Sequence, residues 1–323
     1  MTNRIGMSVL GICFCVCSVG AAAREVWPSK PIRLVNPYTP GGAVDTVART
    51  LSQQMSETWG QPVIVDNRPG AGTTIGMDIV AQAVGDGYTL LVNNGSVATV
   101  VPLYPKLALN PVKDFAPIAL AVQSPYLLGV QPSLKVNNVQ EFIAYAKARP
   151  GQLLFGSTGM GSLAQLTMEL LKANAKIDLL HVPYKGGAPN ITALLSGEVQ
   201  AIFGPVSAIT PLAKIGKIKA LAVSSAKRVE LAPEIPTVAE QGVPGFEATS
   251  WYPIFAPART PLAITQKANA DINRILQKPE VKSHFLALGM IPVIGSPEML
   301  SDYLRAEINR WTKIIISTGV KPE

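Results

Sequence analysis

The sequence predicts an α/β protein with two lobes, each built on a mainly parallel sheet, joined by two chain crossings. Short runs rich in Val, Ile and Leu alternate with amphipathic helical segments after the first two dozen residues. The alternation falls into two successive series, and each contains a glycine-rich turn between a strand and a helix. Strand–helix alternation favours parallel strands with right-handed crossovers, so we expect one such sheet in each lobe.

Short apolar runs bounded by turn residues mark the strands. We predict strands at Ile32–Asn36, Val63–Asp66, Thr89–Asn93, Leu153–Gly156, Leu179–Val182, Gln200–Phe203, Lys219–Ser224 and Trp251–Ala256. Helical spacing marks the helix faces, one formed by Val44, Val47, Ala48, Leu51 and Met55 and another by Leu163, Leu166, Leu170 and Leu171. Two further helix starts carry capping signals, namely Asn138 with Glu141 and Ser296 with Pro297.

The two series define the predicted lobes. Residues 24–122 together with the tail 251–323 form lobe 1, because the tail is too small and too helical to stand alone. Residues 123–250 form lobe 2. The chain then crosses between the lobes near Ala121–Pro125 and near Phe246–Pro253. A hinge of two crossing segments allows the lobes to close around a ligand.

The first residues have the layout of a secretory signal peptide. Arg4 is followed by the apolar run Ile5–Gly20 and by three alanines, which predicts cleavage after Ala23. The alternative is a membrane anchor, but the run is shorter than the roughly 20 residues that a spanning helix needs. All three cysteines lie in this run, so the mature protein would contain no disulfide, thiol nucleophile or thiolate metal site.

Charge gives a weaker indication of function. The net charge is +7 for the chain of 323 residues, and the Lys and Arg residues are scattered without a dense basic block. We therefore expect no binding of nucleic acid. A mildly positive field suits a small anion, although solubility is the commoner reason for such a charge.

The first glycine-rich turn has the chemistry of an anion site. Its candidate ligand-binding residues are Tyr38, Thr39, Gly41, Gly42 and Ala43. A helix start presents unpaired backbone N–H groups and the positive end of the helix dipole, and Gly allows a ligand to approach closely. The alternative is an ordinary strand–helix turn in which Gly serves only the backbone geometry. We assign Asp45 a structural role, because a free carboxylate would repel an anion.

The second turn adds the candidates Ser157, Thr158, Gly159 and Ser162, whose hydroxyl and amide groups can donate hydrogen bonds. Its glycines also fit a dinucleotide-binding fingerprint, which requires an acidic residue at the end of the next strand. That strand ends in Pro183-Tyr184 instead, so we expect no nucleotide cofactor. Two candidates lie elsewhere. Asn94 follows a lobe 1 strand, where a turn role is equally plausible, and Tyr184 would be a phenolic donor, an aromatic wall or an ordinary half-buried tyrosine.

The main competing class is a secreted hydrolase acting on a small anionic substrate. The sequence contains only two histidines, His181 and His284, and neither has a predicted nucleophile beside it. Phe155 stands where a nucleophile elbow around Ser157 would need Gly. The histidines also lack metal-ligand spacing. We therefore predict a protein that is not an enzyme and holds no metal and no cofactor.

Seven strings in order carry a resemblance to a known family: PYTPGGAVDTVAR (37–49), VDNRPGAGTTIG (65–76), DGYTLL (86–91), FGSTGMGSLAQL (155–166), HVPYKGGAPNITALLSGEVQ (181–200), IKALAVSSAKR (218–228) and PEIPTVAEQGVPGFE (233–247). The chain resembles the tripartite tricarboxylate transporter substrate-binding family, also called the Bug family. The resemblance covers essentially the whole chain after the signal peptide. It departs from the family at Gln165, where many relatives carry His, and at Gly204, where many carry Asp although Gly is a frequent alternative.

This resemblance implies a periplasmic binding protein of the Venus flytrap type. A small organic carboxylate would lie between the lobes, held by backbone N–H groups and hydroxyls of two loops, partly through water. The loops match Tyr38–Asp45 and Gly156–Ser162, and Gly204 joins the candidate ligand-binding residues because it falls near the expected cleft. The implied partners are subunits of a membrane transporter or a sensor kinase, and we expect the binding protein itself to be a monomer.

Overall fold

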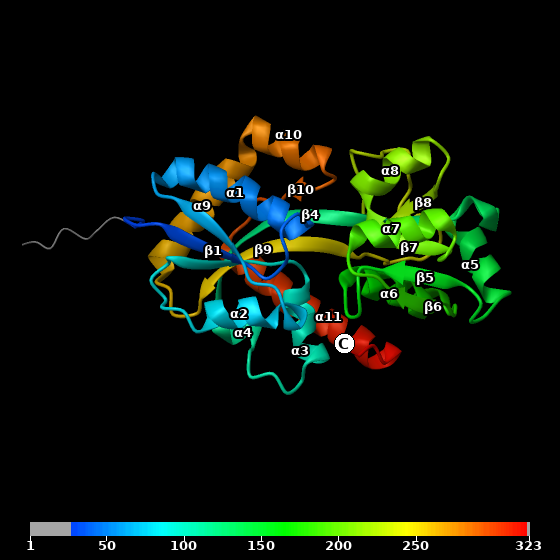
Figure 1. Ribbon diagram of the computed structural model, residues 1–323, viewed down its shortest axis with the longest axis horizontal. Coiled ribbons are helices and arrows are strands. Elements are labelled where there is room, and N and C mark those ends of the chain that lie inside the picture. The colour runs from blue at the N-terminus through cyan, green and yellow to red at the C-terminus, as the bar shows by residue number, and fades with distance from the viewer. Residues whose placement is uncertain (1–26, 322–323) are drawn as a thin grey trace, which may run out of the picture.

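A computed structural model describes residues 27–321 (Figure 1). The predicted signal peptide, with its cleavage site after Ala23, lies outside the described residues. The described residues form one mixed sheet with the strand order β2-β1-β3-β9-β4-β7-β5-β6, and β10 and β8 also pair with β4. The strands are β1 (Ile32–Asn36), β2 (Val63–Asn67), β3 (Thr89–Val92), β4 (Phe115–Val130), β5 (Leu154–Ser157), β6 (Leu180–Pro183), β7 (Ala201–Pro205), β8 (Lys219–Val223), β9 (Thr249–Pro257) and β10 (Ile291–Pro292).

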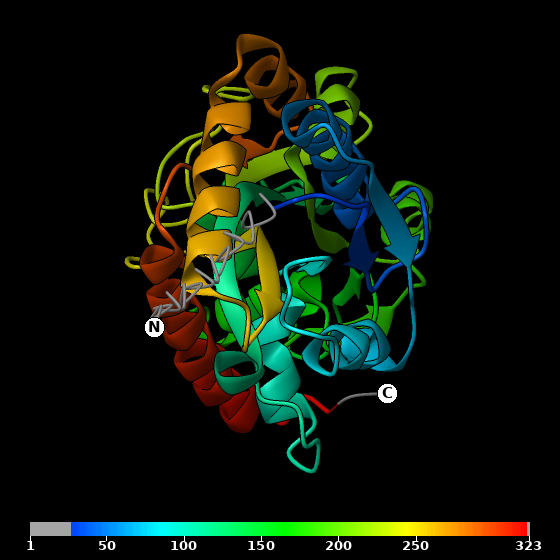
Figure 2. The same ribbon diagram turned by 90° about the vertical axis from the view of Figure 1, so that its left-hand side faces the viewer.

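Helices cover both faces of this sheet (Figures 1 and 2). They are α1 (Ala43–Trp59), α2 (Thr74–Ala81), α3 (Ser96–Leu103), α4 (Pro111–Asp114), α5 (Val139–Lys147), α6 (Leu163–Ala175), α7 (Gly187–Ser196), α8 (Val206–Lys214), α9 (Leu262–Gln277), α10 (Pro279–Ala287) and α11 (Pro297–Thr318). Two short 3₁₀ turns lie at Ala71–Thr73 and Pro132–Leu134. No helix in the described part of the chain is both long and apolar enough to cross a membrane.

The two-lobed α/β prediction is confirmed, with one refinement of the sheet. The outer strands are parallel, since β1 pairs in parallel with β2 and β3, and β5 with β6 and β7. Every antiparallel pair involves β4 or β9. These two strands carry the chain between the halves in opposite directions, so each half has parallel strands outside and antiparallel strands at the centre.

The long strand β4 was missing from the sequence prediction. Pro117 and Pro125 interrupt its sequence, and proline in a run normally argues against a central strand. Up to Pro125 the strand pairs with β9 and β10, and from Tyr126 onward it pairs with β7 and β8. The predicted crossing at Ala121–Pro125 lies within β4, and the one at Phe246–Pro253 enters β9 at Thr249, with Ser124 opposite Ser250. The lobe boundaries at residues 122 and 250 remain a prediction.

Alternating side chains place the two halves of the core on opposite faces of the sheet. In β1, Leu34 packs toward α1, α9 and α10, while Val35 packs toward α2, α3 and α11. Ile254 and Phe255 of β9 divide in the same way. In the other half of the molecule, α7 and α8 cover one face, and α5 and α6 cover the other.

The C-terminal helix connects the two halves. The tail was expected to pack back on the first lobe, and α9 and α10 do so. Helix α11 also contacts α6, and its buried Trp311 and Ile315 belong to the same apolar cluster as Leu171 of α6. The core on this face is therefore continuous beneath both halves, which the sequence prediction did not include.

The predicted helix caps are present. The Asn138 side chain accepts a hydrogen bond from the Glu141 backbone N–H at 2.8 Å, and Glu141 accepts one from the Asn138 amide. Ser296 caps α11 by accepting from the Met299 N–H at 3.3 Å, with Pro297 at the first helical position. These local bonds explain why both helix starts could be identified without tertiary information.

Candidate ligand-binding cleft

Two adjoining cavities lie between the halves of the molecule. The larger has a volume of about 520 Å³ and lies among the starts of α1, α7 and α8. The smaller, of about 320 Å³, lies between α3 and the turn before α6. Tyr38, Asn94, Tyr126 and Thr158 line both cavities. Because these four residues come from both halves, the cavities form one cleft with two compartments.

Three helix N-termini line the larger cavity. They contribute Gly41–Val44 before and within α1, Gly186–Ala188 at α7, and Pro205, Ser207 and Ala208 at α8. The described structure gives the backbone N–H groups of Gly42, Ala43, Gly187 and Ala188 no hydrogen-bond partner. Among the described lining residues there is no Asp, Glu, Lys or Arg. The cavity therefore offers an anion the partial positive charge of helix ends without a charged side chain.

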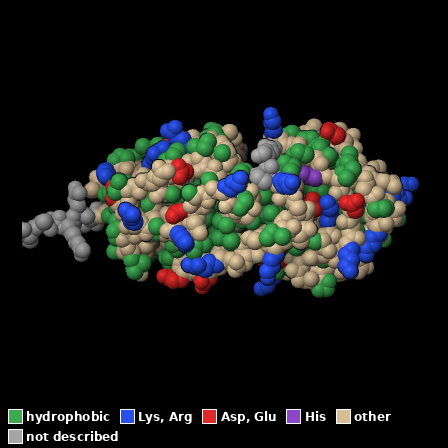
Figure 3. Space-filling view, turned by 90° about the horizontal axis from the view of Figure 1, so that it is seen from below, with side chains coloured by type: hydrophobic (Ala, Val, Ile, Leu, Met, Phe, Trp, Pro, Cys, Tyr) green, Lys and Arg blue, Asp and Glu red, His purple; other side chains and the backbone are tan. Residues whose placement is uncertain are grey.

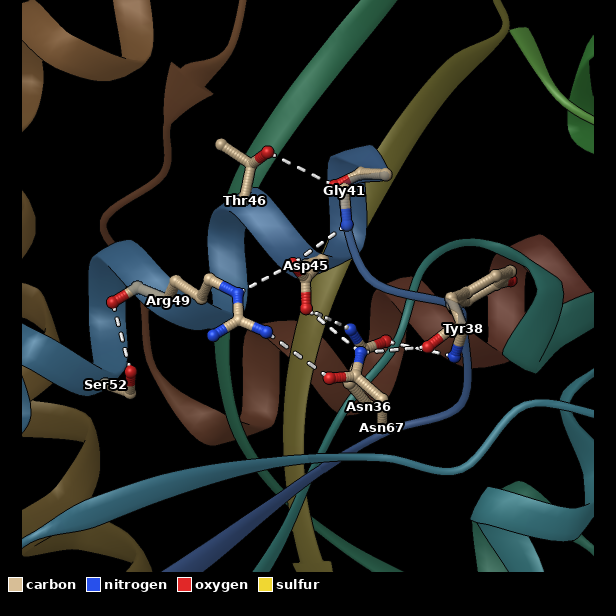
Figure 4. A network of polar contacts seen from close by, with 9 residues as sticks. Asn36, Tyr38, Gly41, Asp45, Thr46, Arg49, Ser52 and Asn67 are labelled. Atoms are coloured by element: carbon tan, nitrogen blue, oxygen red, sulfur yellow. Dashed lines mark hydrogen bonds and ion pairs between the residues drawn. The ribbon is translucent and has the colours of Figure 1, made fainter.

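The Asp45 side chain holds the first turn in place through a network of hydrogen bonds (Figure 4). One carboxylate oxygen accepts hydrogen bonds from the Gly41 N–H at 3.0 Å and from Arg49 Nε at 2.7 Å. The other oxygen accepts from the amides of Asn67 at 3.0 Å and Asn36 at 3.3 Å. Asp45 is buried and lines neither cavity. The structural role predicted for Asp45 is confirmed. Its hydrogen bonds leave the N–H groups of Gly42 and Ala43 free.

The electrostatics of Asp45 follow from these contacts. Burial by itself would raise the pKa of the carboxyl group. The hydrogen bonds from Arg49, Gly41 and Asn67 outweigh burial and lower the pKa to about 2. Asp45 is therefore ionised at neutral pH, and its charge is compensated within the turn.

Tyr38 and Asn94 form part of the wall that both compartments share. The Tyr38 hydroxyl donates to Asn94 Oδ1 at 2.7 Å and lies 2.9 Å from the Ser96 hydroxyl. Asn94 Oδ1 also accepts from the Ser96 backbone N–H at 2.9 Å. Burial raises the pKa of Tyr38 far above its usual value, so its phenol stays protonated. The sequence placed these two residues in one site although 56 positions separate them.

The second turn is held by its own side chains. Ser162 caps α6 by accepting from the Gln165 N–H at 3.3 Å, and the Gln165 side chain accepts from the Gly161 N–H at 2.7 Å. Gln165 is buried, so this departure from the family pattern supports the turn instead of lining the cleft. Thr158 lines both compartments, and Gly159 lines the smaller one.

Ser157 and His181 form a contact that the sequence did not reveal. The expectation that neither histidine has a nucleophile beside it was wrong, because Ser157 Oγ lies 2.7 Å from His181 Nε2. The two residues sit on the neighbouring parallel strands β5 and β6, an adjacency that cannot be read from their separation in the chain. Ser157 is 0% exposed and lines neither cavity. It lies beneath the second turn and not in the cleft wall.

The structure brings the other sequence-predicted site residues together. The larger cavity is lined by Tyr38, Thr39, Gly41, Gly42, Ala43, Asn94, Thr158 and Gly204. The smaller cavity is lined by Tyr38, Asn94, Thr158, Gly159, Ser162 and Tyr184. Tyr184 also donates to Glu198 at 2.8 Å, and burial together with this carboxylate raises the pKa of its phenol to about 12. Their contact with a ligand stays a prediction.

The crossing strands supply a cleft floor that sequence reasoning missed. Ser124 and Tyr126 of β4 and Ser250 and Tyr252 of β9 line the larger cavity. Each pair is spaced by two residues, so both members face the same side of the sheet. That alternation was visible in the sequence, but it had no meaning until β4 was known to be a strand. Asn190 of α7 is also in the wall, with its side-chain oxygen buried and unpartnered.

Charged residues lie mostly outside the cleft. Lys185 is exposed and is the charged residue among those described around the smaller cavity. On the face in Figure 3, Lys and Arg side chains are spread over both halves without a dense block. The described residues contain no group of three His, Cys, Asp or Glu side chains that could hold a metal ion.

Comparison with known proteins places this fold and cleft in a family. The model of the tripartite tricarboxylate transporter family receptor matches residues 47–320. The protein BugT of Bordetella pertussis is 35% identical over 318 residues, which cover 98% of each chain.

Two solved structures of relatives from Rhodopseudomonas palustris are similar over most of the chain. Rpa4515 with adipate is 35% identical with a TM-score of 0.82, covering 92% of this chain and 100% of that one. MatC with bound malate is 34% identical with a TM-score of 0.78, covering 90% and 100%. The chain therefore belongs to the tripartite tricarboxylate transporter receptor family, a family of periplasmic binding proteins.

Proposed function

We propose that this protein captures a small organic carboxylate in the cleft between its halves and hands it on unchanged. The observation that supports this most is the larger cavity, lined by three helix N-termini and by hydroxyl groups but by no charged side chain among the described residues. Such a lining stabilises an anion through aligned dipoles and hydrogen bonds. Hydroxyl groups are present, but no His, Asp, Glu or Lys side chain that could activate one as a nucleophile is among the described lining residues.

The carboxylate would bind at the first turn. Gly42 and Ala43 are exposed residues with unpartnered N–H groups, and Thr39 lies with them in the cavity wall. Across the cleft, Thr158 adds a hydroxyl group from the second turn. Two relatives have been solved with the dicarboxylates adipate and malate. We extend this class of ligand, and not a particular acid, to the present chain.

Closure of the two lobes about β4 and β9 would enclose the ligand, with lobe 1 formed by residues 24–122 and 251–323 and lobe 2 by residues 123–250. A ligand that prefers the closed form stabilises that form. The protein would be exported, lose its signal peptide near Ala23 and act in the periplasm as a monomer. It would pass the ligand to membrane transporter subunits or to a sensor kinase.

A hydrolase is the second candidate, and the Ser157–His181 contact of 2.7 Å is the observation in its favour. Two features argue against it. Ser157 is 0% exposed, so no substrate reaches its hydroxyl, and the same oxygen already binds both backbone groups of Gly159. We therefore propose that the chain is not an enzyme.

Thermal-shift measurements with a panel of mono- and dicarboxylic acids, including adipate and malate, test the proposal. A binding acid at a hundred times its Kd adds about 2.7 kcal/mol to the free energy of unfolding, which raises the melting temperature by several degrees. Calorimetric titration should confirm one saturable site. The matched variant is Gly42→Val, which should lose about half of the stabilisation or more by blocking approach to the first turn, since a tenfold weaker Kd leaves about 1.4 kcal/mol at the same acid concentration.

The contrary result is equally clear. If no acid in the panel shifts the melting temperature and the protein turns over a p-nitrophenyl ester, the binding proposal fails and the hydrolase gains support. In that case Ser157→Ala should abolish the turnover. If ester turnover is absent and one acid binds, the hydrolase is excluded.

A further inference from the structure

The buried hydroxyl of Ser157 joins the strand β5 to the turn that follows it. Ser157 Oγ donates to the Gly159 carbonyl oxygen at 2.9 Å and accepts from the Gly159 N–H at 3.1 Å. Its third contact is His181 Nε2 at 2.7 Å. A hydroxyl group has one proton to donate and two lone pairs to accept with. The three contacts use all of them, so Ser157 has no hydrogen-bonding capacity left for a ligand.

This arrangement fixes the role of the imidazole. Because the serine proton goes to Gly159, the bond to His181 requires a proton on Nε2 that the ring donates to Ser157 Oγ. The ring is neutral in this state, since burial and then the nearby charge of Lys172 lower the pKa of His181 to about 4. A neutral ring with its proton on Nε2 leaves Nδ1 as an acceptor.

The imidazole of half-buried His181 packs against an aromatic ring of the neighbouring strand. Its ring stacks on Phe155 with the centroids 4.9 Å apart and the planes at 27°. Phe155 is itself buried in the core. The Lys172 ammonium group lies 5.5 Å from the centre of the Phe155 ring and is paired with Glu169 at 3.0 Å. Phe155 and Ser157 of β5 thus contact His181 by ring stacking and by a hydrogen bond to Nε2, and Lys172 of α6 packs over Phe155.

The turn above needs such a support. Gly159 has a φ of +133° and Gly161 a φ of +70°, so the backbone here adopts conformations that only glycine takes readily. Beyond the Ser157 bonds, the turn is tied by the Ser162 N–H to the Gly159 carbonyl at 3.3 Å, by the Gly161 N–H to the Gln165 side chain at 2.7 Å and by the cap on α6. Thr158, which faces both compartments, lies between Ser157 and Gly159. Its placement therefore depends on bonds made on either side of it.

We propose that Ser157 and His181 are a positioning pair that holds the second glycine-rich turn in the shape that faces the cleft, and that neither residue contacts the ligand. Ser157 supplies the bonds to the turn, and the donated imidazole proton keeps the serine hydroxyl aimed at Gly159. The assignment goes beyond the proposed function, and only the binding measurement below rests on it.

Four variants separate this role from general stability. Ser157→Ala removes both hydroxyl bonds to Gly159, and His181→Leu removes the imidazole while keeping the serine. His181→Gln keeps a side-chain N–H donor at similar reach. His284→Leu is the matched control, because His284 is exposed on α10. Circular dichroism and melting temperature verify that each variant is folded, and His181→Gln keeps the test valid should the leucine variant fail to fold.

Hydrogen exchange of the ligand-free protein is the first measurement. In His181→Leu the amides of Gly159 and Ser162 should exchange about tenfold faster, the change expected from losing one hydrogen bond. Ser157→Ala should have at least as large an effect. His181→Gln should stay within about threefold of wild type, as should His284→Leu. Unchanged exchange at both amides in His181→Leu, or in Ser157→Ala, would overturn the proposal.

Calorimetric titration with adipate is the second measurement. In the variants whose amides exchange faster, the Kd for adipate should rise by about tenfold. His181→Gln should bind adipate nearly as tightly as wild type does. Faster exchange with an unchanged Kd would overturn the link between the pair and binding. A wild-type protein that binds no acid of the panel would overturn the proposed function instead, and the exchange measurement would still decide the positioning pair.

Discussion

The carboxylate of Asp45 is the support on which the first turn depends, and Asp45→Asn is the substitution that tests it. The carboxylate accepts from four donors, which belong to Gly41, Arg49, Asn67 and Asn36. An asparagine has one acceptor oxygen and adds an NH₂ group of its own, so donors that are now paired would lose their partner. We therefore expect lower stability and weaker carboxylate binding with no change of fold.

The magnitude follows from the pKa of Asp45, which is lowered from 3.8 to about 2. This difference corresponds to about 2.4 kcal/mol of stability above pH 4. Arg49 is 57% exposed, so solvent screening reduces the effect to about 1–2 kcal/mol. Because the folded-state pKa lies below the unfolded value, the contribution is complete at neutral pH. It is lost as pH falls from 4 toward 2, with about half gone by pH 3.

The assay is urea unfolding followed by tryptophan fluorescence at pH 7.5 and at pH 3. Asp45→Asn should lower the free energy of unfolding by about 1–2 kcal/mol at pH 7.5, and the gap to wild type should shrink by about 0.5–1 kcal/mol at pH 3. The control is Asp86→Asn, whose carboxylate meets exposed Lys30 at 3.5 Å and should matter by less than about 0.5 kcal/mol. The role assigned to the Asp45 carboxylate would be refuted if both variants lost the same free energy of unfolding, or if the difference between Asp45→Asn and wild type did not depend on pH.

Three further outcomes are expected. Because the pKa of His181 is lowered in the folded state, the unfolded state takes up a proton at a higher pH than the folded state does. The free energy of unfolding, measured with urea, should therefore rise by about 1–2 kcal/mol between pH 4 and 6.5 in wild type but not in His181→Gln. Gly42→Val should weaken acid binding in calorimetry by at least about tenfold. The melting temperature of the ligand-free protein should change little, because a Cβ at Gly42 would meet only the Thr39 carbonyl oxygen, at 4.0 Å. Retained affinity would remove the first turn from the site. Gly161→Ala should destabilise by about 1–3 kcal/mol more than Gly216→Ala in urea unfolding. Both have φ near +70°, but only the former would bring a methyl group within 2.8 Å of Leu103 from the other half; equal losses would mean that this contact is soft.

Local signals in the sequence were sufficient for most of the secondary structure. The first strand is found at the predicted residues, and the caps at Asn138 and Ser296 form as expected. These features depend on neighbours a few positions away, so no tertiary information is needed to recognise them. The long strand β4 was not predicted, because Pro117 and Pro125 are poor strand residues. In the structure both pair with β9, and the register shifts next to Pro117.

The candidate site also combines residues that local signals identified with residues whose role depends on tertiary structure. Glycine-rich turns at helix starts identified Gly42 and Thr158, and both lie in the cleft wall. Ser157 had the same local signature but lies beneath the turn, because the strand that carries His181 lies next to its own. Whether a residue faces a cavity or supports one depends on the neighbouring element, which a single strand does not encode.

By itself, the sequence determined the α/β class, the two glycine-rich turns and the likeness to a family of binding proteins. Each of these depends on residues that are close together in the chain. Only the tertiary structure decided that α1, α7 and α8 direct their N-termini into one cavity, that β4 and β9 provide its floor, and that α11 joins the core of both halves. The physical reason is that convergence in space depends on long-range strand pairing and packing. Those contacts join residues that have no pattern in common along the chain.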